Sequence, residues 1–82
     1  MMKEIPVPIA EIYVPARLRG TLDPAKVETL AEDILEHGQQ TAISVRKGDK
    51  RYVLVSGLHR LEACKSLGEA TIRAILVGAR QF

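Results

Sequence analysis

Five consecutive residues combine side chains and backbone features that could hold a phosphate group. The apolar run Val53–Val55 is typical of a buried strand, and a glycine two residues later turns the chain straight into a helix. The free backbone N–H groups of a helix N-terminus and the helix dipole both favour an anion. Arg60 can donate two charge-assisted hydrogen bonds to phosphate oxygens, and His59 offers an imidazole N–H from another direction. The sequence therefore predicts a phosphate site formed by Ser56, Gly57, Leu58, His59 and Arg60.

The same segment also fits a purely structural role. Ser56 could cap the helix, Gly57 could serve only the turn, and Arg60 could pair with a surface carboxylate such as Glu62 or Glu69. Motifs this short recur in unrelated proteins. Local chemistry leaves both interpretations open.

Two helices and four strands are predicted, in the order β-α-β-β-α-β. The first strand lies within residues 4–14, where prolines confine it to the edge of a sheet. Arg17 and Arg19 follow in a basic loop. The pair Asp23-Pro24 then has the N-cap and the first-turn proline of a helix start, which predicts a helix over residues 24–37.

The apolar residues of this helix have the spacing of an amphipathic stripe, and Gly38 is placed to end it. We expect the stripe to face the core through Val27, Leu30, Ala31, Ile34 and Leu35.

The second half of the chain predicts a hairpin, a helix and a last strand. Residues 41–46 and 51–55 are rich in β-branched and aromatic residues and flank a polar loop with a glycine, as in an antiparallel hairpin. A helix over residues 58–67 ends before Gly68, and residues 71–77 are expected to form a buried strand. The residues of this helix expected in the core are Leu61, Cys64 and Leu67.

Composition limits the chain to one domain, residues 1–82, of 46% hydrophobic residues and a formal charge of +2. A charge this small permits a polyanionic partner without requiring one. The single cysteine excludes an internal disulfide and indicates a reducing compartment. Because no apolar run approaches the length of a signal peptide or a membrane span, we expect a cytoplasmic protein with no membrane partner.

Nearly the whole chain resembles the ParB/sulfiredoxin superfamily. In that family a glycine, a basic pair two residues later, an alanine and a leucine-glycine stop form the phosphate-binding loop and its helix. The resemblance implies an α/β (α+β) fold of the ParB/sulfiredoxin type, with a small mixed sheet and two main helices. The matching segments are residues 43–45, 52–63 and 65–68, with Gly57, His59, Arg60, Ala63 and Gly68 at the motif positions.

This resemblance implies a nucleotide-binding module that takes CTP or ATP, with Mg²⁺, and is associated with DNA partition or with regulation of plasmid or phage DNA. Arg17 and Arg19 would cover the phosphates from the opposite side. In ParB proteins the segment after the first helix reads glycine, two variable residues, glutamine and proline, and it closes around a cytidine nucleotide. The corresponding residues here are Gly38, Gln39, Gln40 and Thr41, followed by Ala42 in place of a proline.

Two departures separate the chain from characterised branches of the superfamily. Sulfiredoxins carry a catalytic cysteine immediately before the His-Arg pair, where this chain has Leu58. Cys64 lies more than a helical turn later, so we do not expect sulfiredoxin activity. The resemblance ends with the chain at Phe82, before the helix-turn-helix domain of ParB proteins, so we expect a stand-alone module.

Other functions remain open at this stage. A metal-assisted nucleotide hydrolase or weak nuclease would use Glu62 or Glu11 to assist a metal-bound water, although no side-chain cluster forms an obvious metal site. A DNA-associated accessory protein would hold backbone phosphates at the same junction. The edge strand of so small a domain also favours a homodimer.

Overall fold

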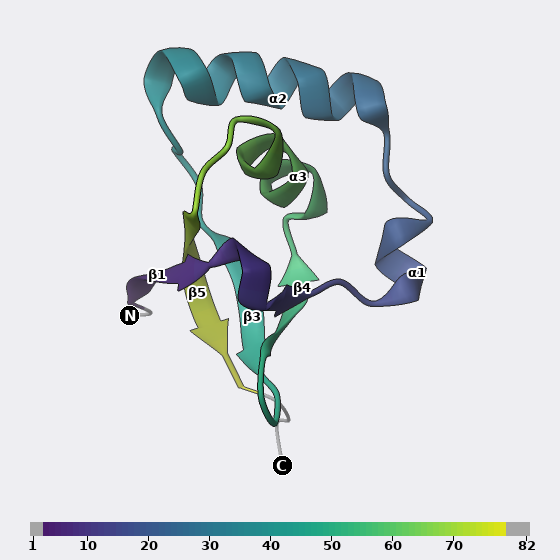
Figure 1. Ribbon diagram of the computed structural model, residues 1–82, viewed down its shortest axis with the longest axis vertical. Coiled ribbons are helices and arrows are strands. Elements are labelled where there is room, and N and C mark those ends of the chain that lie inside the picture. The colour runs from purple at the N-terminus through teal and green to yellow at the C-terminus, as the bar shows by residue number, and fades with distance from the viewer. Residues whose placement is uncertain (1–2, 79–82) are drawn as a thin grey trace.

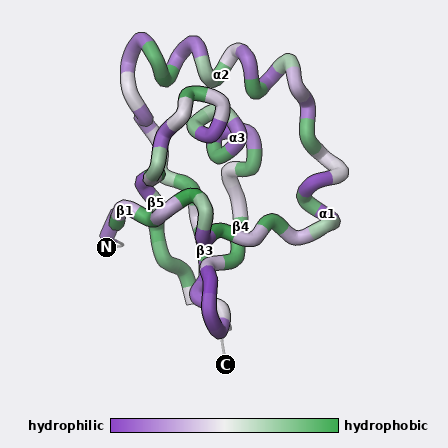
Figure 2. Tube along the Cα trace, viewed as in Figure 1, coloured by the Kyte–Doolittle hydropathy of each residue, from purple (hydrophilic) through white to green (hydrophobic). Residues whose placement is uncertain are grey.

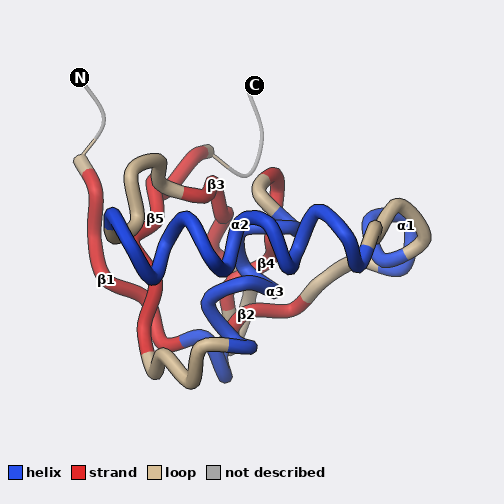
Figure 3. Tube along the Cα trace, turned by 90° about the horizontal axis from the view of Figure 1, so that it is seen from above, coloured by secondary structure: helices blue, strands red, loops and turns tan. Residues whose placement is uncertain are grey.

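The computed structural model describes residues 3–78 and contains a curled five-stranded sheet covered on one side by helices. The strand order is β1-β5-β3-β4-β2, with antiparallel pairing between β1 and β5 and between β3 and β4, and parallel pairing in the other two pairs. Helix α3 (Leu58–Ser66) lies against the sheet, and α2 (Pro24–His37) crosses over α3 (Figures 1 and 3). The predicted mixed sheet with two main helices is confirmed; residues 1–2 and 79–82 of the predicted domain lie outside the described residues.

The N-terminal arm forms both edges of the sheet, which differs from the single strand predicted within residues 4–14. Strand β1 (Glu4–Pro8) pairs with β5, a 3₁₀ turn (Ile9–Glu11) redirects the chain, and β2 (Ile12–Tyr13) pairs with β4 at the opposite edge. The turn is fixed by a 2.9 Å hydrogen bond from the Ile9 N–H to the Ala70 carbonyl. The position at a sheet edge was predicted correctly, whereas the interruption depends on a residue far away in the sequence.

The predicted basic loop is instead a short helix, α1 (Ala16–Arg19). Pro15 precedes it with φ near −58°, and its carbonyl accepts hydrogen bonds from the N–H groups of Leu18 and Arg19. A proline before residues of good helix propensity favours one such turn. In Figure 1, α1 stands beside the sheet at the N-terminal end of α2.

Helix α2 has the predicted bounds. The Asp23 side chain caps it by accepting from the Ala25 N–H at 3.0 Å, and Gly38 ends it with φ of 79°. Ile34 is buried in the core, and Val27, Leu30 and Ala31 pack against the core. Leu35 was predicted to join them but is 77% exposed, because it lies about 100° around the helix from Ile34. Figure 2 shows the resulting alternation of polar and apolar residues along α2.

The hairpin and the last two elements agree closely with the predictions. Strands β3 (Ile43–Lys47) and β4 (Tyr52–Ser56) pair in antiparallel fashion, α3 is followed by Gly68 with φ of 78°, and β5 spans Thr71–Val77. Ile72 and Ala74 of β5 are buried as expected. Leu76 is 43% exposed, and Ile75 and Val77 are half-buried, so the second half of the predicted buried strand is more exposed than expected.

The core lies between the sheet and the two longer helices. Its largest fully buried side chains are Ile43, Leu54, Leu61, Ile72, Val7 and Val45. Leu61 and Cys64 of α3 are buried and Leu67 packs against the core, as the spacing predicted. Within residues 3–78, no helix has both the length and the hydropathy needed to cross a membrane.

Gly57 joins β4 to α3 in a conformation and a space that only glycine fits. Its φ is 102°, and a Cβ atom placed on it would lie 2.6 Å from Ile43 Cγ2 and 2.9 Å from Ile43 Cβ. The positive φ is a left-handed conformation that residues with a side chain disfavour. The short distances are an overlap with the branch point of the Ile43 side chain, which is 1% exposed. The start of α3 is therefore fixed directly against β3.

We predict that Gly57→Ala lowers the free energy of unfolding by about 2–4 kcal/mol, because the strain of a positive φ and the overlap with Ile43 both act. Urea unfolding followed by circular dichroism measures the change. Gly68→Ala is the matched control: its φ is also positive, but nothing lies within 4 Å of the added Cβ, so only about 1–2 kcal/mol should be lost. Equal losses in the two variants would contradict the packing explanation.

Candidate functional site

The N-terminus of α3 has no side-chain cap. Its N-cap residue is Gly57, which has no side chain to accept a hydrogen bond, and the first helical hydrogen bond runs from the Leu61 N–H to the Gly57 carbonyl at 2.9 Å. The backbone N–H groups of residues 58–60 therefore have no partner within the helix. Ser56 belongs to β4 and pairs with Ser44, so the interpretation that it merely caps the helix is wrong.

A β-bulge lies immediately before this junction. Ser44 pairs with Ser56 and Val45 pairs with Leu54, which leaves Val55 as an extra residue on β4. Bulges of this kind bend a strand and change the direction of the residues that follow. Sequence reasoning missed this feature, because the run Tyr52–Ser56 gives no sign of which residue is left unpaired.

His59 connects the start of α3 to the start of α2. Its Nε2 atom accepts a hydrogen bond of 3.0 Å from the backbone N–H of Asp23. An accepting Nε2 carries no proton, so the ring proton of the neutral imidazole lies on Nδ1. His59 thus orients the N-cap of α2 with one nitrogen and retains an N–H donor on the other.

Arg60 has no ion-pair partner among residues 3–78. The carboxylate of Glu62, one of the two partners considered for it, pairs instead with Lys65 at 3.6 Å, and Glu69 forms no ion pair within the described part of the chain. Arg60 is half-buried in the first turn of α3, and its positive charge also acts on Cys64 one turn later. The two ion pairs considered for Arg60 are therefore absent within residues 3–78.

Leu58 contributes to this site only through its backbone. Its side chain is 6% exposed and belongs to the core cluster, where it holds the first turn of α3 against the sheet. The position at which sulfiredoxins carry a reactive thiol is here occupied by a buried hydrocarbon.

Arg19 lies close to α3, although it comes from the separate helix α1. It lines a hollow of about 260 Å³ together with Glu62 and Lys65 of α3 and with residues 12–14 of the N-terminal arm. Arg17 is exposed on the same short helix. The fold thus places Arg19 next to the helix that carries Arg60, whereas Arg17 does not line this hollow.

The two candidate catalytic carboxylates line different hollows. Glu62 is in the hollow with Arg19, whereas Glu11 lines one at the β3–β4 hairpin with residues 47–52. No group of three or more His, Cys, Asp or Glu side chains suited to a metal ion occurs among residues 3–78. The described side chains alone therefore do not form a carboxylate-rich metal centre.

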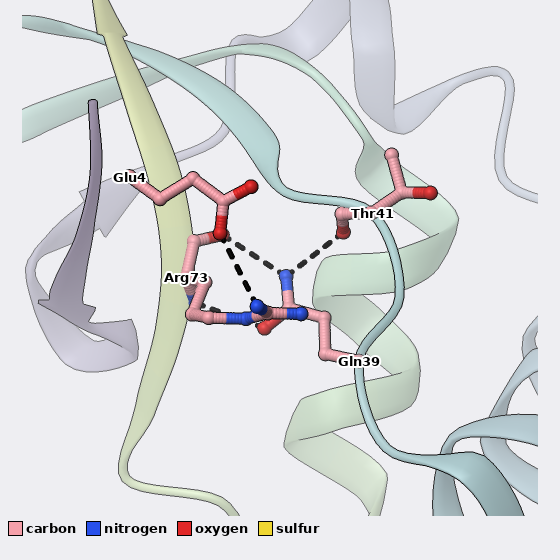
Figure 4. A network of polar contacts seen from close by, with 4 residues as sticks. All are labelled: Glu4, Gln39, Thr41 and Arg73. Atoms are coloured by element: carbon pink, nitrogen blue, oxygen red, sulfur yellow. Dashed lines mark hydrogen bonds and ion pairs between the residues drawn. The ribbon is translucent and has the colours of Figure 1, made fainter. Parts of the chain in front are cut away.

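The side chain of Gln39 is occupied in holding the fold together. Its Nε2 donates to the carbonyls of Thr41 and Arg73, each at 3.0 Å, and its Oε1 accepts from the Arg73 N–H at 2.9 Å (Figure 4). The Arg73 guanidinium in turn pairs with Glu4 at 3.2 Å. Gln39 thus continues the β3–β5 ladder with an amide side chain, and both of its N–H hydrogens are used.

The other residues predicted near a base lie around this network. Gln40 donates to the His37 carbonyl at 3.0 Å, and Gly38 has φ of 79° and ψ of 173°, a backbone conformation almost restricted to glycine. The segment Gly38–Thr41 therefore has a defined shape, and its contact with a base stays a prediction.

Cys64 is protected in the core. Burial raises the pKa of its thiol, the nearby Glu69 carboxylate acts in the same direction, and Arg60 opposes them. A buried thiol with a raised pKa is a poor nucleophile at neutral pH.

The mixed sheet, the covering helices and the glycine junction define a domain of the ParB/sulfiredoxin type. The chain matches the ParB N-terminal domain over residues 2–81, and it therefore belongs to the ParB N-terminal domain family.

Two relatives in sequence come from different branches. The nucleoid occlusion protein of Halalkalibacterium halodurans is 39% identical over 72 residues, which is 85% of this chain and 25% of that protein. The chloroplastic/mitochondrial sulfiredoxin of Arabidopsis thaliana is 36% identical over 69 residues, 84% of this chain and 55% of that protein. This chain thus spans between a quarter and about half of the length of these relatives.

Solved structures share the fold over almost the whole chain. The crystal structure of the same Arabidopsis sulfiredoxin has a TM-score of 0.83 and 32% identity, covering 94% of this chain and 86% of that one. The C-terminally truncated chromosome-partitioning protein ParB of Caulobacter crescentus, complexed with CTP-γ-S, has a TM-score of 0.81 and 24% identity, covering 96% of this chain and 46% of that one.

We predict that the Cys64 thiol reacts slowly with Ellman's reagent in the folded protein and rapidly in denaturant, because it is buried and its pKa is raised. A control protein with Cys64→Ser and Ser66→Cys moves the thiol to an exposed position on the same helix and should react rapidly when folded. Fast reaction of Cys64 in the folded protein would contradict this and would reopen thiol chemistry.

The same shift predicts how stability changes at alkaline pH. The thiol of the unfolded chain ionises at its ordinary pKa, whereas the thiol of the folded protein stays protonated to higher pH. The contribution of the Cys64 thiol to stability is therefore complete below the ordinary pKa. It is lost as the pH rises through the raised pKa of the folded state. The free energy of unfolding of the wild type should fall relative to that of Cys64→Ala above a pH of about 9. Parallel curves from urea unfolding would show that burial does not shift this pKa.

Proposed function

We propose that this chain is a nucleotide-binding module that holds the phosphates of CTP or ATP at the N-terminus of α3. The observation that carries the proposal is the pairing of an uncapped helix end with an Arg60 that has no ion-pair partner among residues 3–78. Positive charge left without a partner beside free backbone N–H groups matches the negative charge and the multiple acceptors of a phosphate chain.

Three kinds of donor meet at this site. The backbone N–H groups of residues 58–60 point out of the helix end, Arg60 can add a bidentate contact, and His59 can donate from Nδ1 while Nε2 stays bonded to Asp23. Ser56 lies at the end of β4 and can add a hydroxyl contact. Arg19 borders the same helix, and with Arg17 it would approach the phosphates from α1.

Gly57 is part of this site through the backbone. With a side chain at this position α3 could not begin against Ile43, and the N–H groups would point elsewhere. The buried Leu58 keeps the first turn in place. The donors are therefore held in position before a ligand arrives, which reduces the entropy lost on binding.

Mg²⁺ fits this site only as an ion carried by the nucleotide. Mg²⁺ in proteins often keeps several waters and is bound by phosphates with one or two carboxylates, so a cluster of protein ligands is not required. Phosphate oxygens and water would hold the ion, because Glu62 is already paired with Lys65, and the ion would neutralise phosphate charge.

Base recognition is proposed for the segment Gly38–Thr41. Because both N–H hydrogens of Gln39 are used within the fold, contacts to a base would come from backbone groups and from Gln40. The complex of the Caulobacter ParB with CTP-γ-S supports cytidine as the first base to test.

The biological setting that we propose is DNA partition or the regulation of plasmid or phage DNA. The named functions of the nucleoid occlusion and chromosome-partitioning relatives support this setting. Hydrolysis ranks behind binding, since Glu62 is paired with Lys65 and Glu11 lines a separate hollow.

Isothermal titration calorimetry with CTP, ATP and GTP, with and without Mg²⁺, tests the proposal. We expect at least one of them to bind, and Arg60→Ala to weaken that binding about 10–100-fold through the loss of a charge-assisted bidentate contact. Lys50→Ala, which removes one positive charge at the β3–β4 hairpin, is the control and should bind as the wild type does. Absence of heat with all three nucleotides, or an Arg60→Ala variant of unchanged affinity, would overturn the proposal.

A further inference from the structure

Positive charge is concentrated at the β3–β4 hairpin, which is not part of the proposed nucleotide site. The six residues from Arg46 to Arg51 include four of the chain's 12 lysines and arginines, and Asp49 is the only acid among them. We call this segment, residues 46–51, the hairpin tip. It lies at the opposite end of the molecule from α2 (Figure 1), and Figure 2 shows it as strongly hydrophilic.

Among the described residues, no ion pair neutralises these positive charges. The ion pairs within residues 3–78 join Asp33 with His37, Glu62 with Lys65, and Glu4 with Arg73, so none involves the hairpin tip. Its two lysines and Arg51 are exposed, and Arg46 is half-buried. Asp49, and Glu11 at the border of the adjoining hollow, offset two of the four charges without contacting them as ion pairs.

Arg51 is held in position by an aromatic ring. Its guanidinium carbon lies 4.0 Å from the centroid of the Tyr13 ring, and that of Arg19 lies 6.0 Å from the same centroid. A guanidinium over an aromatic face is stabilised electrostatically and keeps its N–H donors at the edge of the plane. Tyr13 belongs to β2, which pairs with β4, so the sheet itself positions this arginine.

The loop has a compact and defined shape. The Gly48 N–H donates to the Arg51 carbonyl at 2.8 Å, and a Cβ on Gly48 would lie 2.9 Å from that carbonyl oxygen. Hollows border the loop, one lined by Glu11 and residues 47–52 and another by residues 48–51 and Val53. The charges are therefore spread over a firm tip rather than collected in a single pocket.

We propose that the hairpin tip binds the phosphodiester backbone of duplex DNA without regard to base sequence. Several charges without an ion-pair partner among residues 3–78 lie along a narrow two-stranded end and suit a regularly repeated anion. A two-stranded ribbon also fits the dimensions of a DNA groove. The segment Arg-Lys-Gly-Asp-Lys-Arg has no apolar side chain, which disfavours insertion into a lipid surface. The site stands apart from Gly57 at the other end of β4 and does not depend on nucleotide binding.

Fluorescence anisotropy with a labelled duplex of random sequence, repeated over a range of salt concentrations, tests this proposal. The wild type should bind with an affinity that falls linearly on a double logarithmic plot against salt. The double variant Lys47→Glu/Lys50→Glu should bind at least about tenfold more weakly. The slope of the logarithm of its affinity against the logarithm of salt concentration should be shallower by about 2.

Two further variants distinguish binding at the hairpin tip from an effect of net charge and from binding at the nucleotide site. Lys3→Glu/Lys26→Glu makes the same change in net charge at exposed positions outside the hairpin tip and should retain most of the affinity. Arg60→Ala should also retain it. Circular dichroism melting curves that match the wild type establish that each variant is folded.

Several results would overturn the proposal. The first is failure of the wild type to bind the duplex. The second is an equal loss of affinity in the hairpin variant and the net-charge control. The third is loss of DNA binding in Arg60→Ala, which would place the DNA at the α3 junction. Binding to phosphatidylserine vesicles but not to duplex DNA would assign the tip to a lipid surface instead.

Discussion

The contact between Gly57 and Ile43 sets the geometry on which the candidate site depends. Because the backbone of Gly57 packs directly on a buried side chain of β3, α3 can begin only at one height above the sheet and in one direction. The bulge at Val55 turns the chain into this position, and the buried Leu58 fixes the first helical turn. Packing in the core thus determines the direction of the free N–H groups of α3, so the same contact that packs the core also positions the candidate site.

The two longer helices are coupled through polar as well as apolar contacts. Helix α2 packs over α3, and the bond from the Asp23 N–H to His59 joins the N-termini of the two helices. At the other end of α2, Gln39 connects the exit of the helix to the backbone of β5. Both ends of α2 are thus tied to elements distant in sequence, and a ligand that engages His59 would also contact the group that orients the start of α2.

Local signals explain which features could be predicted from the sequence. The cap at Asp23, the apolar stripe of α2, the hairpin and the glycine stops are each specified by residues within a few positions of one another. These predictions were confirmed, except that Leu35 lies outside the buried stripe. The division of the N-terminal arm, the role of Gln39 and the second function of His59 each depend on a partner at least 34 positions away. That Arg60 has no ion-pair partner among residues 3–78 could not be predicted either, because Glu62 pairs with Lys65 instead.

The N-terminal arm, by supplying both edges of the sheet, has a consequence for how the chain reaches its fold. Glu4 of β1 pairs with Ile75 of β5, which lies far along the sequence, so this edge can close only after β5 has been synthesised. Contacts of such long sequence separation slow folding, and the open side of β5 stays available to other chains until β1 arrives. During synthesis β1 is made before every other described element, yet its partner β5 is made after all of them.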